Sequence, residues 1–244
     1  MIAMKLSHLA FIAALSTAVC LSTISQAVTL VAVDVGHTLE KPGATSARGE
    51  TEFNFNRAMA EKVGQAVLAV GFTAKPVGED GKMKDLQART DAAAQADFFL
   101  SIHHDSMQPQ YLSEWVYNGK TLAYGDRFSG FSLFVSRKNA HLPTSLKCAS
   151  TIGRALIHAG FKPSRHHAEP ILGENRPFAD KPNGVHYYDD LVVLKTAHQP
   201  AVLMETGIIV NRGDELMLRE TATREKIAKA VASALAVCLA KPAG

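Results

Sequence analysis

Short apolar runs recur along the chain after residue 27, separated by longer stretches of mixed polarity. The runs are rich in β-branched and aromatic residues and are bounded by glycine, proline or charged residues, a composition typical of buried strands. They cover residues 29–33, 72–76, 97–103, 131–135, 191–194 and 201–204. We expect a β-strand at each of them.

Between these runs, apolar residues recur at helical spacing. Phe55, Met59, Val63 and Val67 share one face of a helix that starts near Glu52. Further helices are predicted over residues 86–94, with Arg89 facing water, and over residues 147–158, 215–218 and 227–239. Strands that alternate with helices predict an α/β domain, and the chain length fits one such domain.

The first 27 residues have the pattern of a secretory signal peptide. Lys5 supplies a positive charge, residues 9–21 are apolar, and Ser25-Gln26-Ala27 fits a cleavage site. The apolar run is too short to span a bilayer. We therefore expect export to the periplasm or the cell exterior, with residues 28–244 as the catalytic domain and no integral membrane segment in it.

Charge and cysteine content narrow the classes of partner. The formal net charge is +3, and no basic stripe is interleaved with aromatic residues. Nucleic acid is therefore a poor candidate partner. Cys148 and Cys238 could form a disulfide in an oxidising compartment or could remain small buried thiols, and the sequence leaves both alternatives open.

Three predicted strands lead into polar side chains. Asp34 and His37 follow the first run, His103 and His104 end the third, and Glu205 follows the last. Ligand and catalytic groups of open α/β sheets gather at the carboxyl ends of strands. Because neighbouring side chains on a strand point to opposite faces, we expect at most one of the two adjacent histidines to contribute.

One carboxylate and two imidazoles are a natural ligand set for a catalytic zinc ion with an open position. Such an ion lowers the pKa of its bound water to about 7 and polarises a carbonyl group. A nearby carboxylate can then move the proton to a leaving amine, and Glu205 is placed to do so. The pattern predicts metal-assisted amide hydrolysis. Glu50 and Glu52, at the start of a helix, could also simply be acids that favour a helix N-terminus.

In two long segments the apolar residues follow neither the helical nor the strand period. Residues 106–130 form either a cleft wall or lid, or a surface insertion. Residues 162–186 carry His166, His167, Glu169, Glu174 and His186. These residues could make a second metal site, but their spacing fits no motif, so we expect a solvated loop.

Short motifs in a fixed order carry a family resemblance. They are Asp34-Val35-Gly36-His37, Pro42-Gly43-Ala44, Glu52-x-x-Phe55-Asn56, Ser101-Ile102-His103 and Pro200-Ala201-Val202-Leu203-x-Glu205-Thr206-Gly207, followed by Asn211 and Asp214. In this order the chain resembles the zinc-dependent N-acetylmuramoyl-L-alanine amidases of bacterial cell walls, which include cell-separation and sporulation enzymes. The chain has Val35, Thr38 and Ile208 where family members often have Pro, Gly and Phe.

The resemblance implies a single three-layer αβα domain with a twisted, mostly parallel (mixed) sheet, phosphorylase/hydrolase-like. It implies that His37, Glu52 and His103 hold zinc and that Glu205 is the catalytic acid/base. It thereby favours Glu52 over Glu50. The expected reaction is hydrolysis of the bond between N-acetylmuramic acid and L-alanine of the peptidoglycan stem peptide.

Two alternatives remain at this point. One is another zinc-dependent envelope peptidase that acts on the stem peptide, and the other is a non-catalytic wall-binding protein. The presence of His37, Glu52, His103 and Glu205 argues against the second. The expected partner is peptidoglycan or a muropeptide. Polymeric wall and soluble fragments are both compatible with the sequence as substrates, and a protein activator is a further candidate partner.

Overall fold

The computed structural model describes residues 28–240, so the predicted signal peptide at residues 1–27 lies outside the described residues. A seven-stranded sheet runs through the described part in the order β2-β1-β3-β9-β6-β8-β7. Its strands are β1 (Leu30–Val35), β2 (Thr73–Val77), β3 (Phe98–Asp105), β6 (Ser132–Val135), β7 (Phe178–Asp180), β8 (Val185–Tyr187) and β9 (Ala201–Ile208).

The sheet is mixed, as expected. Strands β2, β1, β3 and β9 are parallel neighbours. Strand β6 runs antiparallel to β9 and parallel to β8, and β7 is antiparallel to β8. The parallel half therefore brings the carboxyl ends of β1, β3 and β9 to one edge, which is where α/β proteins place their ligand groups.

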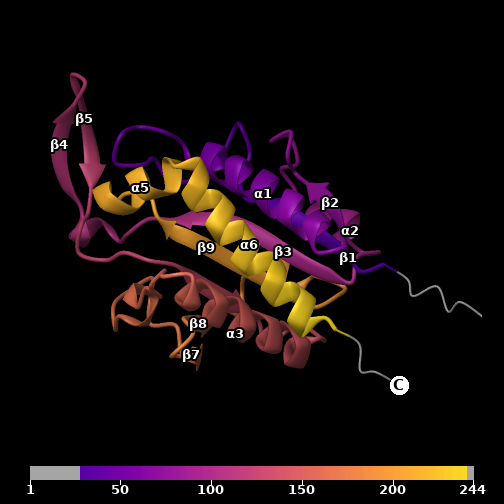
Figure 1. Ribbon diagram of the computed structural model, residues 1–244. Helices are drawn as coiled ribbons and strands as arrows, with labels where there is room; N and C mark the ends of the chain where they lie inside the picture. Colours follow the sequence, from indigo (N-terminus) through magenta and orange to yellow (C-terminus); the bar gives the residue numbers. More distant parts are fainter. Residues whose placement is uncertain (1–27, 241–244) are drawn as a thin grey trace, which may run out of the picture.

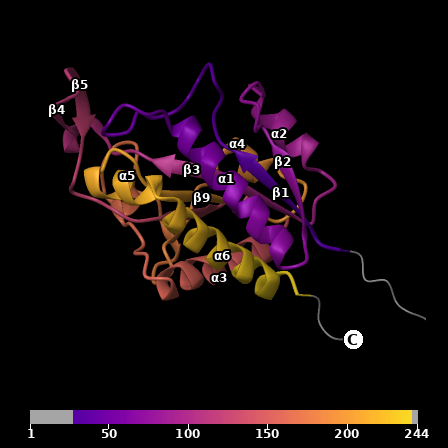
Figure 2. The same ribbon diagram turned by 45° about the horizontal axis from the view of Figure 1, so that its top comes forward.

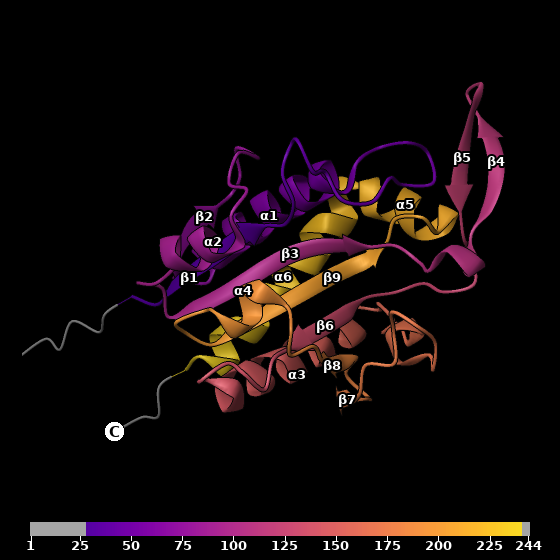
Figure 3. The same cartoon turned by 180° about the vertical axis from the view of Figure 1, so that it is seen from behind.

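Helices cover both faces of the sheet (Figures 1 and 3). The helices α1 (Glu52–Ala69), α3 (Leu142–His158) and α6 (Thr221–Cys238) pack on one face, over alternate strand residues such as Val33, Leu100 and Met204. Helices α2 (Leu86–Ala92) and α4 (Val192–Lys195) pack on the other face, against Phe99 and Leu203. This arrangement confirms the three-layer α/β domain.

Two further elements lie beyond one end of the sheet. Helix α5 (Arg212–Arg219) follows β9, and a hairpin of β4 (Ser113–Tyr117) and β5 (Lys120–Tyr124) projects beside it (Figures 1 and 3). The 3-10 turns Pro109–Tyr111 and His166–Ala168 lie in the segments that showed no period. Within residues 106–130, the part from 113 to 124 is thus a β-hairpin.

The predicted strand at residues 191–194 is wrong. Val192–Lys195 forms the short helix α4, whose Val193 and Leu194 are buried against the sheet. A four-residue apolar run is compatible with either structure, and here the packing of the run on the sheet face decides. Three helices also begin earlier than predicted, at Leu142, Arg212 and Thr221.

A disulfide joins Cys148 of α3 to Cys238 of α6, with the two Cα atoms 5.1 Å apart. This bond decides between the two alternatives that the sequence left open. It ties together α3 and α6, which lie side by side on one face of the sheet (Figure 2). Within residues 28–240, the structure contains no helix with the length and apolar character needed to cross a bilayer.

Candidate active site

Three donor side chains converge at the carboxyl edge of the parallel strands. The His37 Nε2 atom lies 3.0 Å from Glu52 Oε2, and the His103 Nδ1 atom lies 3.1 Å from Glu52 Oε1. All three donor atoms lie within 4.8 Å of one another. His37 follows β1, His103 is on β3 and Glu52 is the first residue of α1, so the fold places two imidazoles and one carboxylate around a single point.

The backbone around these side chains leaves room for them because two positions are glycine. A Cβ atom on Gly36 would lie 2.2 Å from the Nε2 atom of His103. A Cβ atom on Gly43 would lie 2.3 Å from Glu52 Oε2 and would collide with the His37 ring. This cradle and the N,N,O donor set fit a borderline divalent ion such as zinc.

Hydrogen bonds fix the Glu52 carboxylate. The amide of Asn56 donates to Glu52 Oε1 at 3.2 Å and to the Gly36 carbonyl at 3.2 Å. The backbone N–H of Ala44 donates to Glu52 Oε2 at 3.0 Å. Although burial opposes ionisation, the contacts with His103 and His37 hold the pKa of Glu52 well below its usual range. Glu52 is therefore an ionised, oriented carboxylate.

The two adjacent histidines lie on opposite faces of β3. His104 is buried, and its Nδ1 atom lies 2.8 Å from Asn56 Oδ1, so it supports the residue that orients Glu52. Burial lowers the pKa of His104 to about 3, which keeps its ring neutral. Only His103 faces the cluster.

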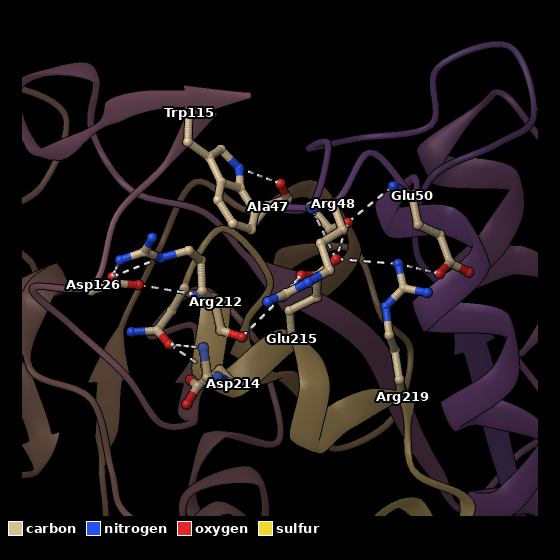
Figure 4. Close-up of polar contacts among 12 residues, drawn as sticks. Ala47, Arg48, Glu50, Trp115, Asp126, Arg212, Asp214, Glu215 and Arg219 are labelled. Carbon is tan, nitrogen blue, oxygen red and sulfur yellow. Dashed lines mark hydrogen bonds and ion pairs between the residues drawn. The ribbon is translucent and has the colours of Figure 1, made fainter. Parts of the chain in front are cut away.

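Glu50 lies away from the cluster. Its carboxylate forms an ion pair with Arg219 of α5, with a 2.9 Å separation between Nη2 and Oε2 (Figure 4). Of the two acids near the start of α1, Glu52 alone joins the histidines.

Glu205 lies within β9, beside His103 of the neighbouring strand, because the two residues are register partners. Its Oε2 atom is shielded from solvent and has no hydrogen-bond partner among residues 28–240. Burial raises the pKa of Glu205 well above its ordinary value, and the negative charges of Asp105 and Glu52 add to this effect. An unpartnered carboxyl group of raised pKa is suited to receiving and releasing a proton.

Arg89 is a supporting residue whose position sequence reasoning predicted wrongly. It is 1% exposed instead of facing water. Its guanidinium group donates to Asp34 Oδ1 at 2.7 Å, to the Val35 carbonyl at 2.6 Å and to the carbonyl of His37. His37 has a φ of 69°, a conformation that non-glycine residues seldom adopt, and Arg89 holds this strained turn in place.

The loop between β1 and α1 is tied to α5 by the buried carboxylate of Glu215 (Figure 4). Glu215 accepts hydrogen bonds from Ser46 Oγ at 2.7 Å and from the backbone N–H of Arg48 at 3.0 Å, and it pairs with the Arg48 guanidinium. Asn211 caps α5 through the backbone N–H groups of Gly213 and Asp214. The chain after β9 thereby anchors the loop that carries Gly43.

A cavity of about 440 Å³ opens beside the donor cluster. His37, His103 and Glu205 line one part of it, and Glu174 and Arg176 line another. A second hollow of about 330 Å³ shares His37 and His103 in its lining and also contains Lys41 and Lys84. The cluster therefore adjoins two spaces that can receive parts of a larger substrate.

The segment at residues 162–186 is not a solvated loop. His166, His167 and His186 are buried, and the rings of His167 and His166 contact Asp105 at the end of β3. Sequence reasoning missed Asp105, although its place two residues after His103, on the same face of the same strand, was a usable indication.

Residues 31–237 match the family model described as N-acetylmuramoyl-L-alanine amidase. The chain is 28% identical over 218 residues to the N-acetylmuramoyl-L-alanine amidase AmiA of Salmonella typhimurium, covering 84% of this chain and 74% of the relative.

Solved structures share the fold. An N-acetylmuramoyl-L-alanine amidase from Clostridium difficile 630 superimposes with a TM-score of 0.68 at 16% identity, covering 87% of this chain and 97% of that one. The CwlD amidase of Clostridioides difficile, solved in complex with the GerS lipoprotein, gives a TM-score of 0.64 at 19% identity, covering 86% and 98%.

Proposed function

The chain belongs to the N-acetylmuramoyl-L-alanine amidase family, and from this premise we propose that it hydrolyses the amide bond between N-acetylmuramic acid and L-alanine of peptidoglycan. The observation that carries the proposal is the placement of Glu205 beside the His37, Glu52 and His103 cluster. A family match over residues 31–237 supports the substrate class.

We propose His37, Glu52 and His103 as the ligands of a catalytic zinc ion. The glycine cradle and the ionised Glu52 carboxylate support this ligand set. Zinc bound there would polarise the scissile carbonyl group and lower the pKa of water. Asn56 orients the Glu52 carboxylate by its hydrogen bond to Oε1.

Glu205 is the proposed acid/base. Its Oε2 atom accepts a proton from the attacking water and returns it to the nitrogen of the departing L-alanine. The lack of a hydrogen-bond partner for this atom among residues 28–240 leaves it free for both transfers. Burial keeps other water from the carboxyl group, which strengthens its interaction with the reacting atoms.

The two cavities that adjoin the cluster suit a substrate with a sugar part and a peptide part. Arg176 lines one cavity, and Lys41 and Lys84 line the other. Peptidoglycan stem peptides carry carboxylates, for which these cations are suitable partners. Export, through a signal peptide at residues 1–27, would bring the enzyme to this substrate.

A protein partner is a further part of the proposal. The CwlD relative is described as a complex with a lipoprotein. Whether this chain requires such an activator is decided by assaying it alone.

The experiment is mass spectrometry of the products that the purified protein forms from a defined muropeptide, with and without a chelator and zinc. Stem peptide with a free alanine amino terminus, formed only with zinc, is the expected product. Cuts within the peptide would instead identify a stem-peptide peptidase. An absence of products from the zinc-loaded enzyme would indicate a wall-binding role or a missing activator.

Glu205→Gln tests the assignment of the acid/base. We expect zinc content to be retained and turnover to fall by about 10²–10⁴-fold, the usual contribution of a positioned acid/base group. Glu50→Gln is the matched control, because Glu50 lies outside the cluster. Full activity of Glu205→Gln would disprove the role.

A further inference from the structure

A second set of donor atoms converges at the carboxyl end of β3. The Nε2 atoms of His166 and His167 lie 3.1 Å and 2.7 Å from the same Asp105 oxygen, Oδ2. All three donor atoms lie within 4.8 Å of one another. The separations match those in the cluster of His37, Glu52 and His103, and the donor types are the same.

The other nitrogen of each ring is held in place. His167 Nδ1 lies 2.8 Å from Glu174 Oε2, and His166 Nδ1 lies 2.9 Å from Ser164 Oγ. Both rings are therefore oriented with Nε2 toward Asp105. Metal-binding histidines are commonly fixed in this way, by an acceptor on the nitrogen that does not bind the ion.

The three donor side chains are buried, so leaving one of their polar atoms without a partner costs free energy. The side chains of His166, His167 and Asp105 are 2%, 11% and 12% exposed. Despite its short distance from Asp105, His166 Nε2 makes no well-directed hydrogen bond to any residue within 28–240. An unpaired buried polar atom usually has a missing partner. A cation at the point of convergence would supply it.

We propose that Asp105, His166 and His167 bind a second divalent transition-metal ion, separate from the ion proposed at His37, Glu52 and His103. Two imidazole nitrogens and one carboxylate oxygen suit zinc and its neighbours rather than calcium or magnesium. The inference depends on the geometry of these residues and does not require the proposed amidase activity.

The second ion faces the same cavity as the first cluster. His167 and Glu174 line the 440 Å³ cavity together with His37, His103 and Glu205. Three protein donors leave coordination positions open, and a carboxylate of the substrate is a suitable ligand for them. The site therefore adds a positive charge to the cavity that receives the substrate.

The alternative to a bound metal ion is a cluster of Asp105, His166 and His167 that is held together by protonation. Without an ion, a protonated His167 would bridge Asp105 and Glu174 as an internal ion pair. The two states differ in metal content, so metal stoichiometry distinguishes them directly.

The test measures zinc per chain by elemental mass spectrometry, after equilibration with excess Zn²⁺ and gel filtration. We expect two equivalents in the unaltered protein, one in His167→Gln, one in His37→Ala and none in the double variant. His198→Gln is the matched control, because His198 is exposed and pairs with Asp91, and it keeps two equivalents. Circular dichroism checks that each variant is folded.

A second measurement uses Co²⁺ with the His37→Ala variant, in which the visible d–d absorption reports the second site alone. Asp105→Asn replaces His167→Gln as the disrupting change if the latter does not fold. One equivalent of zinc in the unaltered protein, or two that persist in folded His167→Gln, would overturn the proposal. Either result leaves the amidase assay unaffected, so the two proposals fail independently.

Discussion

At the scale of single residues, the absence of a Cβ atom at position 36 determines where His103 can lie. In Gly36→Ala, the new Cβ atom would lie 2.2 Å from His103 Nε2, so the ring must rotate away from its partners. We expect zinc affinity to fall by about 10–100-fold, as when a residue that orients a metal ligand is lost. Calorimetric zinc titration measures the change.

Gly64→Ala is the control for this substitution. Gly64 lies in α1, where an added Cβ atom would meet Ala74 at an ordinary 3.9 Å. Alanine in a helix is favoured over glycine by about 0.5–1 kcal/mol, so this variant should gain stability and bind zinc normally. Unchanged zinc affinity in Gly36→Ala would show that the His103 ring can accommodate the added Cβ atom, and it would contradict the prediction.

Arg89 carries a second prediction at this scale. Arg89→Met leaves the buried Asp34 carboxylate with only the hydroxyl of Ser101, at 2.6 Å, as a side-chain partner among residues 28–240. We expect the free energy of unfolding to fall by about 3–5 kcal/mol, the cost of breaking a buried ion pair from one side. Urea denaturation measures it.

Arg137→Ala is the corresponding surface change, because Arg137 forms an exposed pair with Asp189. Such pairs contribute roughly 0–1 kcal/mol. Equal losses in the two variants would contradict the structural role assigned to Arg89.

The convergence of the candidate site residues could be predicted where a local pattern marks them. His37, His103 and Glu205 follow or end apolar runs, so their convergence could be expected from the sheet edge alone. The burial of Arg89 could not be predicted, because its partner Asp34 is 55 positions away and arginine is rarely buried. Local periodicity does not contain such information.

At the scale of elements, α5 acts as an anchor for the loop between β1 and α1. Glu215→Ala removes the acceptor for Ser46 Oγ and the backbone N–H of Arg48, and it leaves the Arg48 side chain without its buried partner. We expect a loss of about 3–5 kcal/mol in the free energy of unfolding. Hydrogen exchange should show faster opening of residues 43–50.

Glu225→Ala is the control, because Glu225 is exposed on α6 and, among residues 28–240, forms an ion pair with Lys62 alone. We expect it to cost at most about 1 kcal/mol. If Glu215→Ala lost stability without faster hydrogen exchange in residues 43–50, Glu215 would stabilise α5 and would not anchor the loop.

Helices and strands could be predicted where a segment was long enough for the spacing of its apolar residues to show a clear period. Helix α1 spans 18 residues with a clear apolar face, and its start was predicted correctly. The four residues of α4 were too few for a period to show, and three-dimensional packing determined their conformation. The burial of His166 and His167 was not predicted because their partner Asp105 belongs to β3, more than 60 positions earlier.

At the scale of the whole molecule, the disulfide between Cys148 and Cys238 closes a large loop. The two cysteines are 90 positions apart, so the bond lowers the entropy of the unfolded chain. We expect Cys148→Ser combined with Cys238→Ser to lose about 4–5 kcal/mol, which for a domain of this size lowers Tm by roughly 10–20 °C.

Scanning calorimetry measures this shift, with dithiothreitol as the control. The reductant should lower the Tm of the unaltered protein to that of the double variant and leave the variant unchanged. A stable reduced protein would mean that the contact between α3 and α6 suffices without the bond.

The strand order has a consequence for when the enzyme becomes active. Strand β9 inserts between β3 and β6, so Glu205 reaches His37 only after most of the chain has been made. Non-local pairing of this kind forms late in folding. A chain that has not yet added β9 to the sheet therefore has the two histidines and Glu52 but lacks the carboxyl group of Glu205 beside them. The proposed acid/base joins the cluster in the last strand of the sheet to be made, so the complete site forms only with the complete fold.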